Sequence, residues 1–189
     1  MLKILLIAGI SYSGKTTLAN QLVNEHPNLF VKPMQVTTRE KRVGETDGVD
    51  YKFISTKTYA TIKDSLSAKT EFNGYLYGTE LILDSDKIQV IVVNKQGSLD
   101  FLDEANDGTD RLKVGLLHTF LHPIDATERA DEADPHRKYR DLYKEMSVYT
   151  VPADITVNAN VVKEKHLARS TLIPIVELFH ENSVSKIFQ

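Results

Sequence analysis

The sequence contains no cysteine among its 189 residues, and this absence removes several kinds of chemistry. Disulfide bonds, thiolate nucleophiles and zinc sites with cysteine ligands are all excluded. A chain without cysteine agrees with a reducing compartment. Stability has to come from a packed core, and a chain of this length is long enough to bury one.

The sequence also lacks a long apolar run and an excess of basic residues. The N-terminal run 4–8 is too short for a signal peptide or a membrane span, which needs about 18 apolar residues. Lys and Arg number 23 against 26 Asp and Glu, a formal charge of −3, whereas general nucleic-acid-binding proteins are usually basic. We therefore expect a soluble cytoplasmic protein, monomer or homodimer, with no membrane and no nucleic-acid partner.

The apolar residues that are present follow the pattern of an α/β fold. Short continuous apolar runs at 3–8, 88–93 and 114–121 are typical of strands buried on both faces of a parallel sheet. Helical periodicity lies between and after them. We predict a mostly parallel sheet flanked by helices, with a further strand at 153–157 and helices at 16–25, 98–105, from about 137 to Val148, and in the C-terminal region, where Pro174 would break or kink the helix.

The stretch between the first two buried strands has a different character. We predict a strand at 30–36, a polar loop at 37–50, a strand at 51–54, a helix capped by Ser55 or Thr56 and reaching Leu66, and short antiparallel strands around a turn at 71–79. Residues 123–136 are acidic, flanked by proline and poor in bulky apolar groups, so they are predicted to form a surface segment.

A phosphate-binding loop follows the first strand. The segment GISYSGKT from Gly9 to Thr16 fits the pattern G-x-x-x-x-G-K-[ST] in full. Glycines let successive N–H groups point at the phosphates, and the following helix adds its positive N-terminal end. Lys15 is predicted to contact the β and γ phosphates of ATP, and the Thr16 hydroxyl to bind Mg²⁺. The predicted ATP-binding residues are Gly9, Ser11, Tyr12, Ser13, Gly14, Lys15, Thr16 and Thr17.

The stretch TTREKRVGETDGVDYKF at 37–53 is the second informative segment. Arg39 and Arg42 can converge on one anion, and their forked donors suit a phosphate. Tyr51 offers a hydroxyl that could join them. Further on, Tyr77 and the hydroxyl of Thr79 lie on either side of Gly78.

Composition alone leaves plainer alternatives open for these residues. The two arginines could belong to a solvated loop with surface ion pairs to Glu40 or Glu45, and Tyr77 could be an ordinary amphipathic core residue.

The two segments resemble the guanylate kinase family. Its pattern T-T-R-x-x-R-x-G-E-x-D-G-x-D-Y-x-F is met at every fixed position of 37–53. Its G-x-Y-Y-G-[ST] segment is matched by Gly74, Tyr77, Gly78 and Thr79, with Leu76 in place of the first tyrosine. The resemblance implies a P-loop kinase that transfers the γ-phosphoryl of ATP to a nucleoside monophosphate, with GMP or dGMP as the default acceptor and Mg²⁺ as cofactor.

The resemblance also implies how the single domain 1–189 is organised. The core would comprise 1–34, 81–122 and 141–189, the monophosphate-binding region about 35–80, and a short lid about 123–140. The matching positions imply that Arg39, Arg42, Tyr51 and Tyr77 hold the acceptor phosphate, with Thr79 by the base.

Positions that would read the base or serve the metal also depart from the family pattern. Gln35 stands where the family has a serine, and Ala68 where it has a glutamate that accepts protons from guanine, although Glu71 lies close by and could substitute. The family's D-x-D-x-Q-G becomes 92–97 VVNKQG, so Asn94 replaces a carboxylate on the Mg²⁺ side and could act only through water. An altered base preference is therefore expected.

Arginines of the lid and one asparagine complete the candidate set. Arg129, Arg137 and Arg140 are candidates for holding charge on the transferred phosphoryl group, although a basic helix face is often simply solvated. Asn158 ends a segment similar to the family's last strand, beside the adenine of ATP, and a plain helix cap is an equally good interpretation. Two other functions stay open: a nucleotide-binding module with weakened catalysis, and a P-loop kinase of another small phosphate ester.

Overall fold

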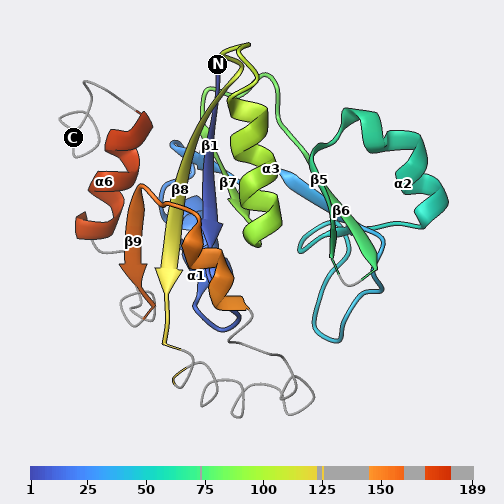
Figure 1. Ribbon diagram of the computed structural model, residues 1–189, viewed down its shortest axis with the longest axis horizontal. Coiled ribbons are helices and arrows are strands. Elements are labelled where there is room, and N and C mark those ends of the chain that lie inside the picture. Colours follow the sequence, from blue (N-terminus) through green and yellow to red (C-terminus); the bar gives the residue numbers. More distant parts are fainter. Residues whose placement is uncertain (73, 123–124, 126–144, 160–168, 180–189) are drawn as a thin grey trace.

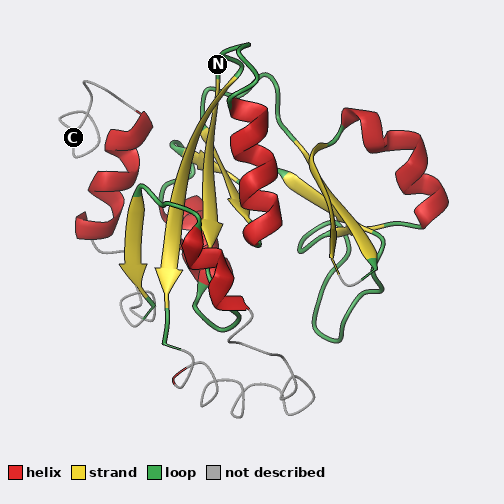
Figure 2. Ribbon diagram, in the orientation of Figure 1, coloured by secondary structure: helices red, strands yellow, loops and turns green. Residues whose placement is uncertain are grey.

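The fold is taken from a computed structural model, which describes residues 1–72, 74–122, 125, 145–159 and 169–179. In these residues the chain forms a larger and a smaller β-sheet, with helix α3 (Lys95–Ala105) between them (Figure 1). Helices, strands and loops are distinguished in Figure 2. No helix of the described part is long and apolar enough to cross a membrane.

The larger sheet is parallel throughout. Its strands run in the order β2-β7-β1-β8-β9, so β1 lies at the centre. Leu6 of β1 pairs with Ile91 of β7 on one side and with Leu116 of β8 on the other. The strands are β1 (Leu2–Ala8), β2 (Phe30–Val31), β7 (Ile88–Val92), β8 (Leu112–Phe120) and β9 (Ile155–Asn158).

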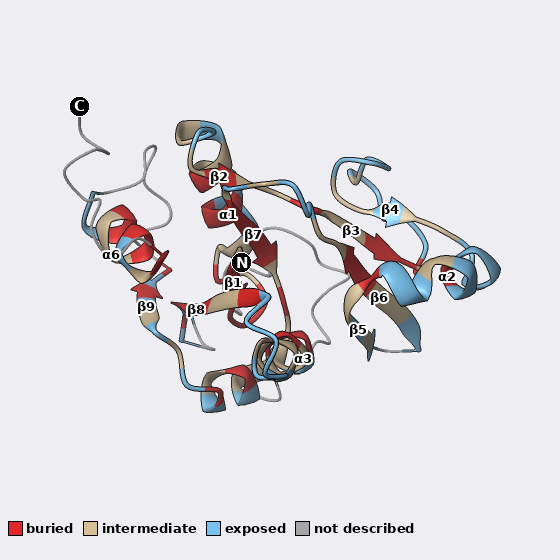
Figure 3. Ribbon diagram, turned by 90° about the horizontal axis from the view of Figure 1, so that it is seen from above, coloured by how far each residue is buried: buried red, intermediate tan, exposed pale blue. Residues whose placement is uncertain are grey.

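Helices cover both faces of this sheet, because β1 is apolar on both. Leu5 and Ile7 pack with α1 (Lys15–Glu25) and α6 (Arg169–Phe179). Ile4, Leu6 and Ala8 pack on the other face with α3 (Lys95–Ala105) and the 3₁₀ helix η3 (Met146–Thr150). Figure 3 shows the buried residues along this central layer. The predicted α/β fold with a mostly parallel sheet is confirmed.

The smaller sheet contains β4, β3, β6 and β5 in that order. Val36 of β3 packs with Tyr59 and Leu66, which lie in the segment between β4 and β5. Ser55 caps that helix, since its side chain accepts a hydrogen bond from the Thr58 N–H. The elements are β3 (Met34–Thr37), β4 (Lys52–Phe53), α2 (Thr56–Ile62), the 3₁₀ turn η1 (Lys63–Ser65), β5 (Ser67–Phe72) and β6 (Tyr75–Glu80).

The predicted strand at 30–36 is wrong as a single element. β2 pairs with β7 in the larger sheet, whereas β3 pairs with β4 and β6 in the smaller one. Pro33 lies between them and has no N–H to donate to a ladder, so the chain leaves one sheet there and enters the other.

Other boundaries differ from the sequence prediction. Helix α3 begins at Lys95 rather than 98, because the Asn94 side chain caps it by accepting from the Gly97 N–H at 2.8 Å. The hairpin begins at Ser67 rather than 71. Helix α6 continues through Pro174 without a break. The last residues of the helix predicted to reach Val148 form the 3₁₀ helix η3, while the surface segment 123–136 lies almost wholly outside the described residues.

Candidate active site

The phosphate loop joins β1 to α1 at the carboxyl edge of the larger sheet. Gly14 has φ 84° and Tyr12 has φ 65°, both in the left-handed region. A Cβ on Gly9 would lie 2.5 Å from the Thr119 carbonyl oxygen, so only glycine fits this close approach to β8. The loop is fixed to β8 by a buried hydrogen bond of 2.7 Å between the Ser13 and Thr119 hydroxyls.

Lys15 begins α1 and folds back over the loop. Its Nζ donates to the Ile10 carbonyl at 2.7 Å. Thr16 and Thr17 are exposed in the first turn of α1, and no acidic residue stands in that turn. No acidic side chain of the first turn therefore neutralises the positive end of the helix. A site for an anion requires such a positive end.

Two residues that sequence reasoning missed hold the first half of this loop. The Ser11 N–H donates to Glu145 Oε2 at 2.6 Å, and the Ser11 hydroxyl donates to Glu145 Oε1 at 3.1 Å. The Tyr149 hydroxyl accepts from the Ile10 N–H at 3.3 Å and donates to the Thr119 carbonyl at 2.9 Å. Both partners lie more than 130 residues along the chain from the loop, so no local pattern could have revealed them.

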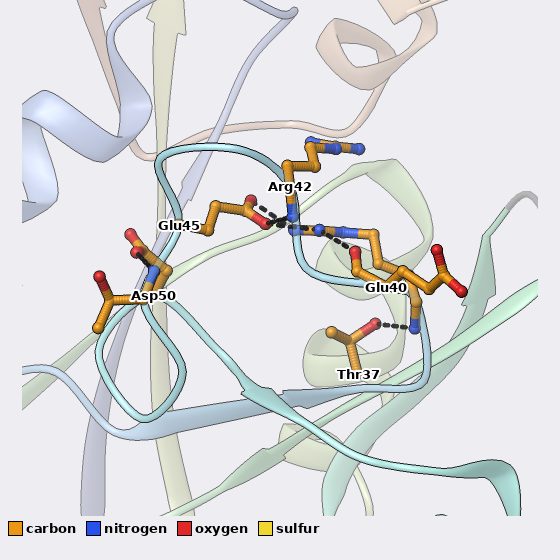
Figure 4. A network of polar contacts seen from close by, with 7 residues as sticks. Thr37, Glu40, Arg42, Glu45 and Asp50 are labelled. Carbon is orange, nitrogen blue, oxygen red and sulfur yellow. Dashed lines mark hydrogen bonds and ion pairs between the residues drawn. The ribbon is translucent and has the colours of Figure 1, made fainter.

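The second candidate region is the loop after β3. Arg39 is 7% exposed, so it is not solvated, whereas the ion pair with Glu45 that the plainer alternative included is present. Its Nη1 and Nη2 donate to the two carboxylate oxygens of Glu45 at 2.7 and 2.6 Å, and Nη1 also donates to the Glu40 carbonyl (Figure 4). Arg42 is exposed and donates to Glu45 through its backbone N–H.

Aromatic rings surround the Arg39 guanidinium. Its central carbon lies 5.2 Å from the ring centres of both Tyr51 and Phe53, a cation–π arrangement. The Tyr77 ring meets the Tyr51 ring edge-on at 6.3 Å. Tyr77 belongs to none of the core clusters of the described residues. The structure thus brings together Arg39, Tyr51 and Tyr77, as the motif predicted.

The charges in this cluster shift its pKa values in a consistent way. The hydrogen bond to Glu45 outweighs burial and raises the pKa of Arg39. Burial opposes ionisation of Glu45, but the hydrogen bonds from Arg39 and from the Arg42 N–H outweigh it and lower the pKa of that carboxyl. Burial, reinforced by Tyr77, raises the pKa of Tyr51, so its hydroxyl stays protonated at neutral pH.

The two faces of the smaller sheet carry different residues. Gln35 pairs with Thr79, and Tyr77 pairs with both Thr37 and Thr70, so these residues share the face opposite α2. The Gln35 Nε2 donates to the Val92 carbonyl at the end of β7, 3.1 Å away. The Thr70 hydroxyl is buried on this face without a hydrogen-bond partner among the described residues, and sequence reasoning missed it.

Of the two residues considered for the guanine-reading carboxylate position, the strand register places only Glu71 away from that face. Glu71 pairs with Leu76, which packs on the α2 side, so Glu71 is exposed on the opposite face. Ala68 lies in a β-bulge with φ 46° and packs against the core cluster that contains α3. The suggestion that Glu71 substitutes for the missing glutamate is therefore not supported by the strand register.

The remaining candidates occupy scattered places. Asn94 caps α3, and Asn158 is the last residue of β9, while any helix that Asn158 would cap lies outside the described residues. Arg129, Arg137 and Arg140 also lie outside the described residues. Among the described residues no three His, Cys, Asp or Glu side chains are grouped so that they could hold a metal ion.

Comparisons with known proteins agree with this arrangement. The family model of guanylate kinase matches residues 1–149. A guanylate kinase of Clostridium perfringens is 33% identical over 169 residues, which cover 84% of this chain and 76% of that protein. One from Helicobacter hepaticus is 37% identical over 101 residues, half of each chain. The crystal structure of guanylate kinase from Anaplasma phagocytophilum has the same fold, with a TM-score of 0.64, 19% identity and coverage of 95% of this chain and 87% of that one.

The fold and the site define an ATP-dependent P-loop enzyme of the nucleoside monophosphate kinase class. Its phosphate loop stands at the carboxyl edge of the parallel sheet, and the smaller sheet carries the arginine–tyrosine cluster. The chain belongs to the guanylate kinase family.

Proposed function

We propose that the protein transfers the γ-phosphoryl group of ATP to the phosphate of a guanine nucleoside monophosphate, GMP or dGMP. The observation that carries this proposal is the buried Arg39, fixed by Glu45 and enclosed by Tyr51 and Phe53 on a loop next to the smaller sheet. A buried, preoriented guanidinium with phenolic hydroxyls nearby is suited to binding a phosphate monoester.

The hydrogen bonds of Arg39 leave one edge of its guanidinium for the acceptor. A guanidinium has about five N–H donors, of which Nη1 uses two, to Glu40 and Glu45, and Nη2 uses one, to Glu45. The two that make no hydrogen bond within the described residues, on Nε and Nη2, lie along the same edge. This edge supports two parallel hydrogen bonds to phosphate oxygens, which Arg42 and the hydroxyls of Tyr51 and Tyr77 would complement.

On the donor side, Lys15 and the phosphate-loop N–H groups would hold the triphosphate. Lys15 would turn from the Ile10 carbonyl to the β and γ phosphates, a short movement of one flexible side chain. Transfer then depends on positioning and on electrostatic stabilisation of the phosphoryl group, since this reaction asks little covalent chemistry of the protein. The region 35–80 would carry the acceptor and the rest of the domain the donor, with Asn158 by the adenine and the segment 123–140 as lid.

Mg²⁺ fits the donor end through few protein ligands. The exposed Thr16 hydroxyl in the first turn of α1 is an oxygen ligand of the kind Mg²⁺ prefers, and this ion commonly keeps several waters and binds substrate phosphates. The Asn94 Oδ1 accepts from the Gly97 N–H and keeps a second lone pair for a metal-bound water. When bound, the ion would neutralise charge on the β and γ phosphates.

The base would be read by neutral groups. Because Gln35 uses its amide nitrogen on the Val92 carbonyl, its Oε1 is the atom left to accept from the N1–H and N2–H₂ donors of guanine. Thr79, 2% exposed and opposite Gln35, adds a hydroxyl on the same face. These residues support guanine binding without a carboxylate.

The test is an ADP-release assay of the purified protein with ATP, Mg²⁺ and GMP, dGMP or non-nucleotide phosphate esters. We expect turnover with GMP and dGMP, and loss of that turnover in Lys15→Ala with the fold retained in circular dichroism, because the phosphate loop loses its side-chain charge. Binding of ATP without turnover would instead support a binding module. Turnover restricted to a sugar phosphate or other ester would instead support a P-loop kinase of another small phosphate ester.

A further inference from the structure

The phosphate loop has a contact that the proposed phosphoryl transfer does not use. Ser11 donates to both carboxylate oxygens of Glu145, through its N–H at 2.6 Å and its hydroxyl at 3.1 Å. A short N–H bond to an ionised acceptor is among the stronger hydrogen bonds in proteins. Glu145 immediately precedes η3, far from the loop in sequence, so the contact is a product of the tertiary fold.

The element that carries Glu145 is firmly packed. Val148 is 3% exposed and belongs to the core cluster that includes residues of α3. Tyr149 lies one turn after Glu145, and its hydroxyl bonds to the Ile10 N–H, the Leu121 N–H and the Thr119 carbonyl. The backbone that carries Glu145 is therefore held by the core, and this fixes the position from which its carboxylate reaches the loop.

Glu145 and Lys15 hold opposite ends of the same peptide group. The carbonyl of Ile10 accepts from Lys15 Nζ at 2.7 Å, and the N–H of the same peptide, on Ser11, donates to Glu145. In a planar trans peptide these two groups point in opposite directions. When Lys15 leaves the carbonyl for ATP, Glu145 is the side chain that keeps this peptide from turning.

Charge alone gives no reason for a carboxylate at this place. A negative group beside a loop that receives a triphosphate repels the ligand, and it occupies an N–H that an anion could use. The contribution of Glu145 is therefore geometric: it fixes the direction of the Ile10–Ser11 peptide.

We propose that Glu145 is a positioning residue of the donor site, which locks the Ile10–Ser11 peptide so that Lys15 exchanges between the loop and the phosphates of ATP without rearranging the loop. This inference rests on the proposed function, because it requires that ATP binds at the phosphate loop. It concerns the donor alone, so the acceptor site should not respond.

The experiment measures ATP affinity by calorimetry in the absence of acceptor, and KM for ATP and for GMP in the ADP-release assay. Glu145→Ala should weaken ATP binding by about tenfold, the usual effect of losing a charge-assisted hydrogen bond. The KM for GMP should stay within about twofold, since the acceptor contacts are untouched. Glu145→Gln should recover most of the affinity, because its amide oxygen still accepts from the Ser11 N–H.

Glu104→Ala is a matched control. Glu104 makes the same kind of contact on the smaller sheet, where it accepts from the Ser67 hydroxyl at 3.0 Å and from the Ala68 N–H at 3.4 Å. Its removal costs a similar carboxylate contact but should leave ATP affinity unchanged. Glu145→Asp covers the case in which the alanine variant does not fold: it keeps the charge, loses the reach and should bind ATP as weakly as expected for alanine.

The outcomes separate this inference from the proposed function. Unchanged or tighter ATP binding in Glu145→Asp or Glu145→Ala would overturn the inference alone, as would a parallel loss of affinity for ATP and GMP. A wild-type protein that does not bind ATP would overturn the proposed function, and the inference with it.

Discussion

Arg39 is the residue whose environment says most about the acceptor site. It is buried, it donates to both oxygens of Glu45, and it lies against two aromatic rings. Exposed ion pairs contribute little to stability, but Arg39 is 7% and Glu45 20% exposed, so this pair is partly withdrawn from water. Its geometry fixes the direction in which the guanidinium can meet a ligand.

Replacing Arg39 and Arg42 separately should distinguish an arginine that only binds the acceptor from one that also stabilises the loop. Both Arg39→Ala and Arg42→Ala should raise KM for the acceptor and leave ATP affinity nearly unchanged, since each removes a charge-assisted contact worth about 1.5–3 kcal/mol. Only Arg39→Ala should also lower the thermal midpoint, because it removes the partly buried ion pair with Glu45, whereas Arg42 is exposed. Steady-state kinetics with each substrate varied, and thermal unfolding, measure these effects.

The expectation for the two arginines can fail in a clear way. Equal changes in KM for ATP and acceptor, or no change in either, would mean that these side chains only support a loop. A thermal midpoint that falls equally in both variants would contradict the different burial of the two residues.

At the scale of elements, β8 joins the donor loop to the core. Thr119 holds the Ser13 hydroxyl, while the preceding residue, His118, is 4% exposed and meets Tyr149 edge-on with ring centres 5.3 Å apart. His118 Nε2 has no hydrogen-bond partner among the described residues. Burial lowers the pKa of His118, so the native state holds this ring neutral.

The buried histidine predicts a loss of stability in mild acid. Its pKa in the unfolded chain is about 6.5 and its pKa in the folded protein is lower, so the unfolded state binds the proton more readily. Its contribution to the free energy of unfolding is fully present above about pH 6.5 and is lost as the pH falls from there towards the folded pKa. Chemical denaturation between pH 7.5 and 5 should show this decline.

The variant His118→Leu isolates that effect. It keeps an apolar side chain of moderate size against Tyr149 and removes the titrating group. Its free energy of unfolding should depend less on pH than that of the wild type over the same interval. An equally steep dependence in the variant would assign the decline to other titrating groups. Glu45 is not one of them, because its lowered pKa places its own loss of stability at more acidic pH.

At the scale of the whole molecule, the position of one sheet against the other decides what faces the acceptor base. Helix α3 lies between the sheets (Figure 1). The Gln35 amide reaches from β3 to the Val92 carbonyl at the end of β7. The bulge in β5 turns Ala68 towards the core cluster that includes α3 and leaves Glu71 on the far face. Among the described residues, the register places Gln35, Thr37, Thr70, Tyr77 and Thr79 on the face opposite α2, and none of these five is a carboxylate.

This arrangement predicts a weaker base preference than a carboxylate would give. A neutral amide oxygen accepts guanine's donors less strongly than a charged group, and it also accepts from the amino groups of adenine and cytosine. We expect kcat/KM for GMP to exceed that for AMP, CMP, UMP and dTMP by less than several hundredfold, measured at one salt concentration. Gln35→Ala should change these ratios.

Glu71→Gln serves as the matched control for the base preference. Because Glu71 pairs with Leu76 on the α2 side, its charge should not affect the ratios. A preference for GMP of several hundredfold or more that disappears in Glu71→Gln would show that β5 has a different register in the working enzyme.

The sequence by itself determined the parts of this protein that depend on local pattern. The continuous apolar runs predict the central strands, since a strand buried on both faces needs apolar residues at every position. The phosphate loop and the segment 37–53 are recognisable because their backbone turns and charges come from neighbouring residues. From these the family, the fold and the class of reaction follow, and the comparisons confirm them.

Only the tertiary structure decided which distant residues meet. The contacts of Glu145 and Tyr149 with the phosphate loop join residues separated by more than 130 positions, and no periodicity encodes such a pairing. The same holds for Glu71: one bulge shifts the register of β5, and because side chains alternate along a strand, that shift determines which residues face the acceptor. Local sequence sets what each segment can form, whereas packing sets which face it presents.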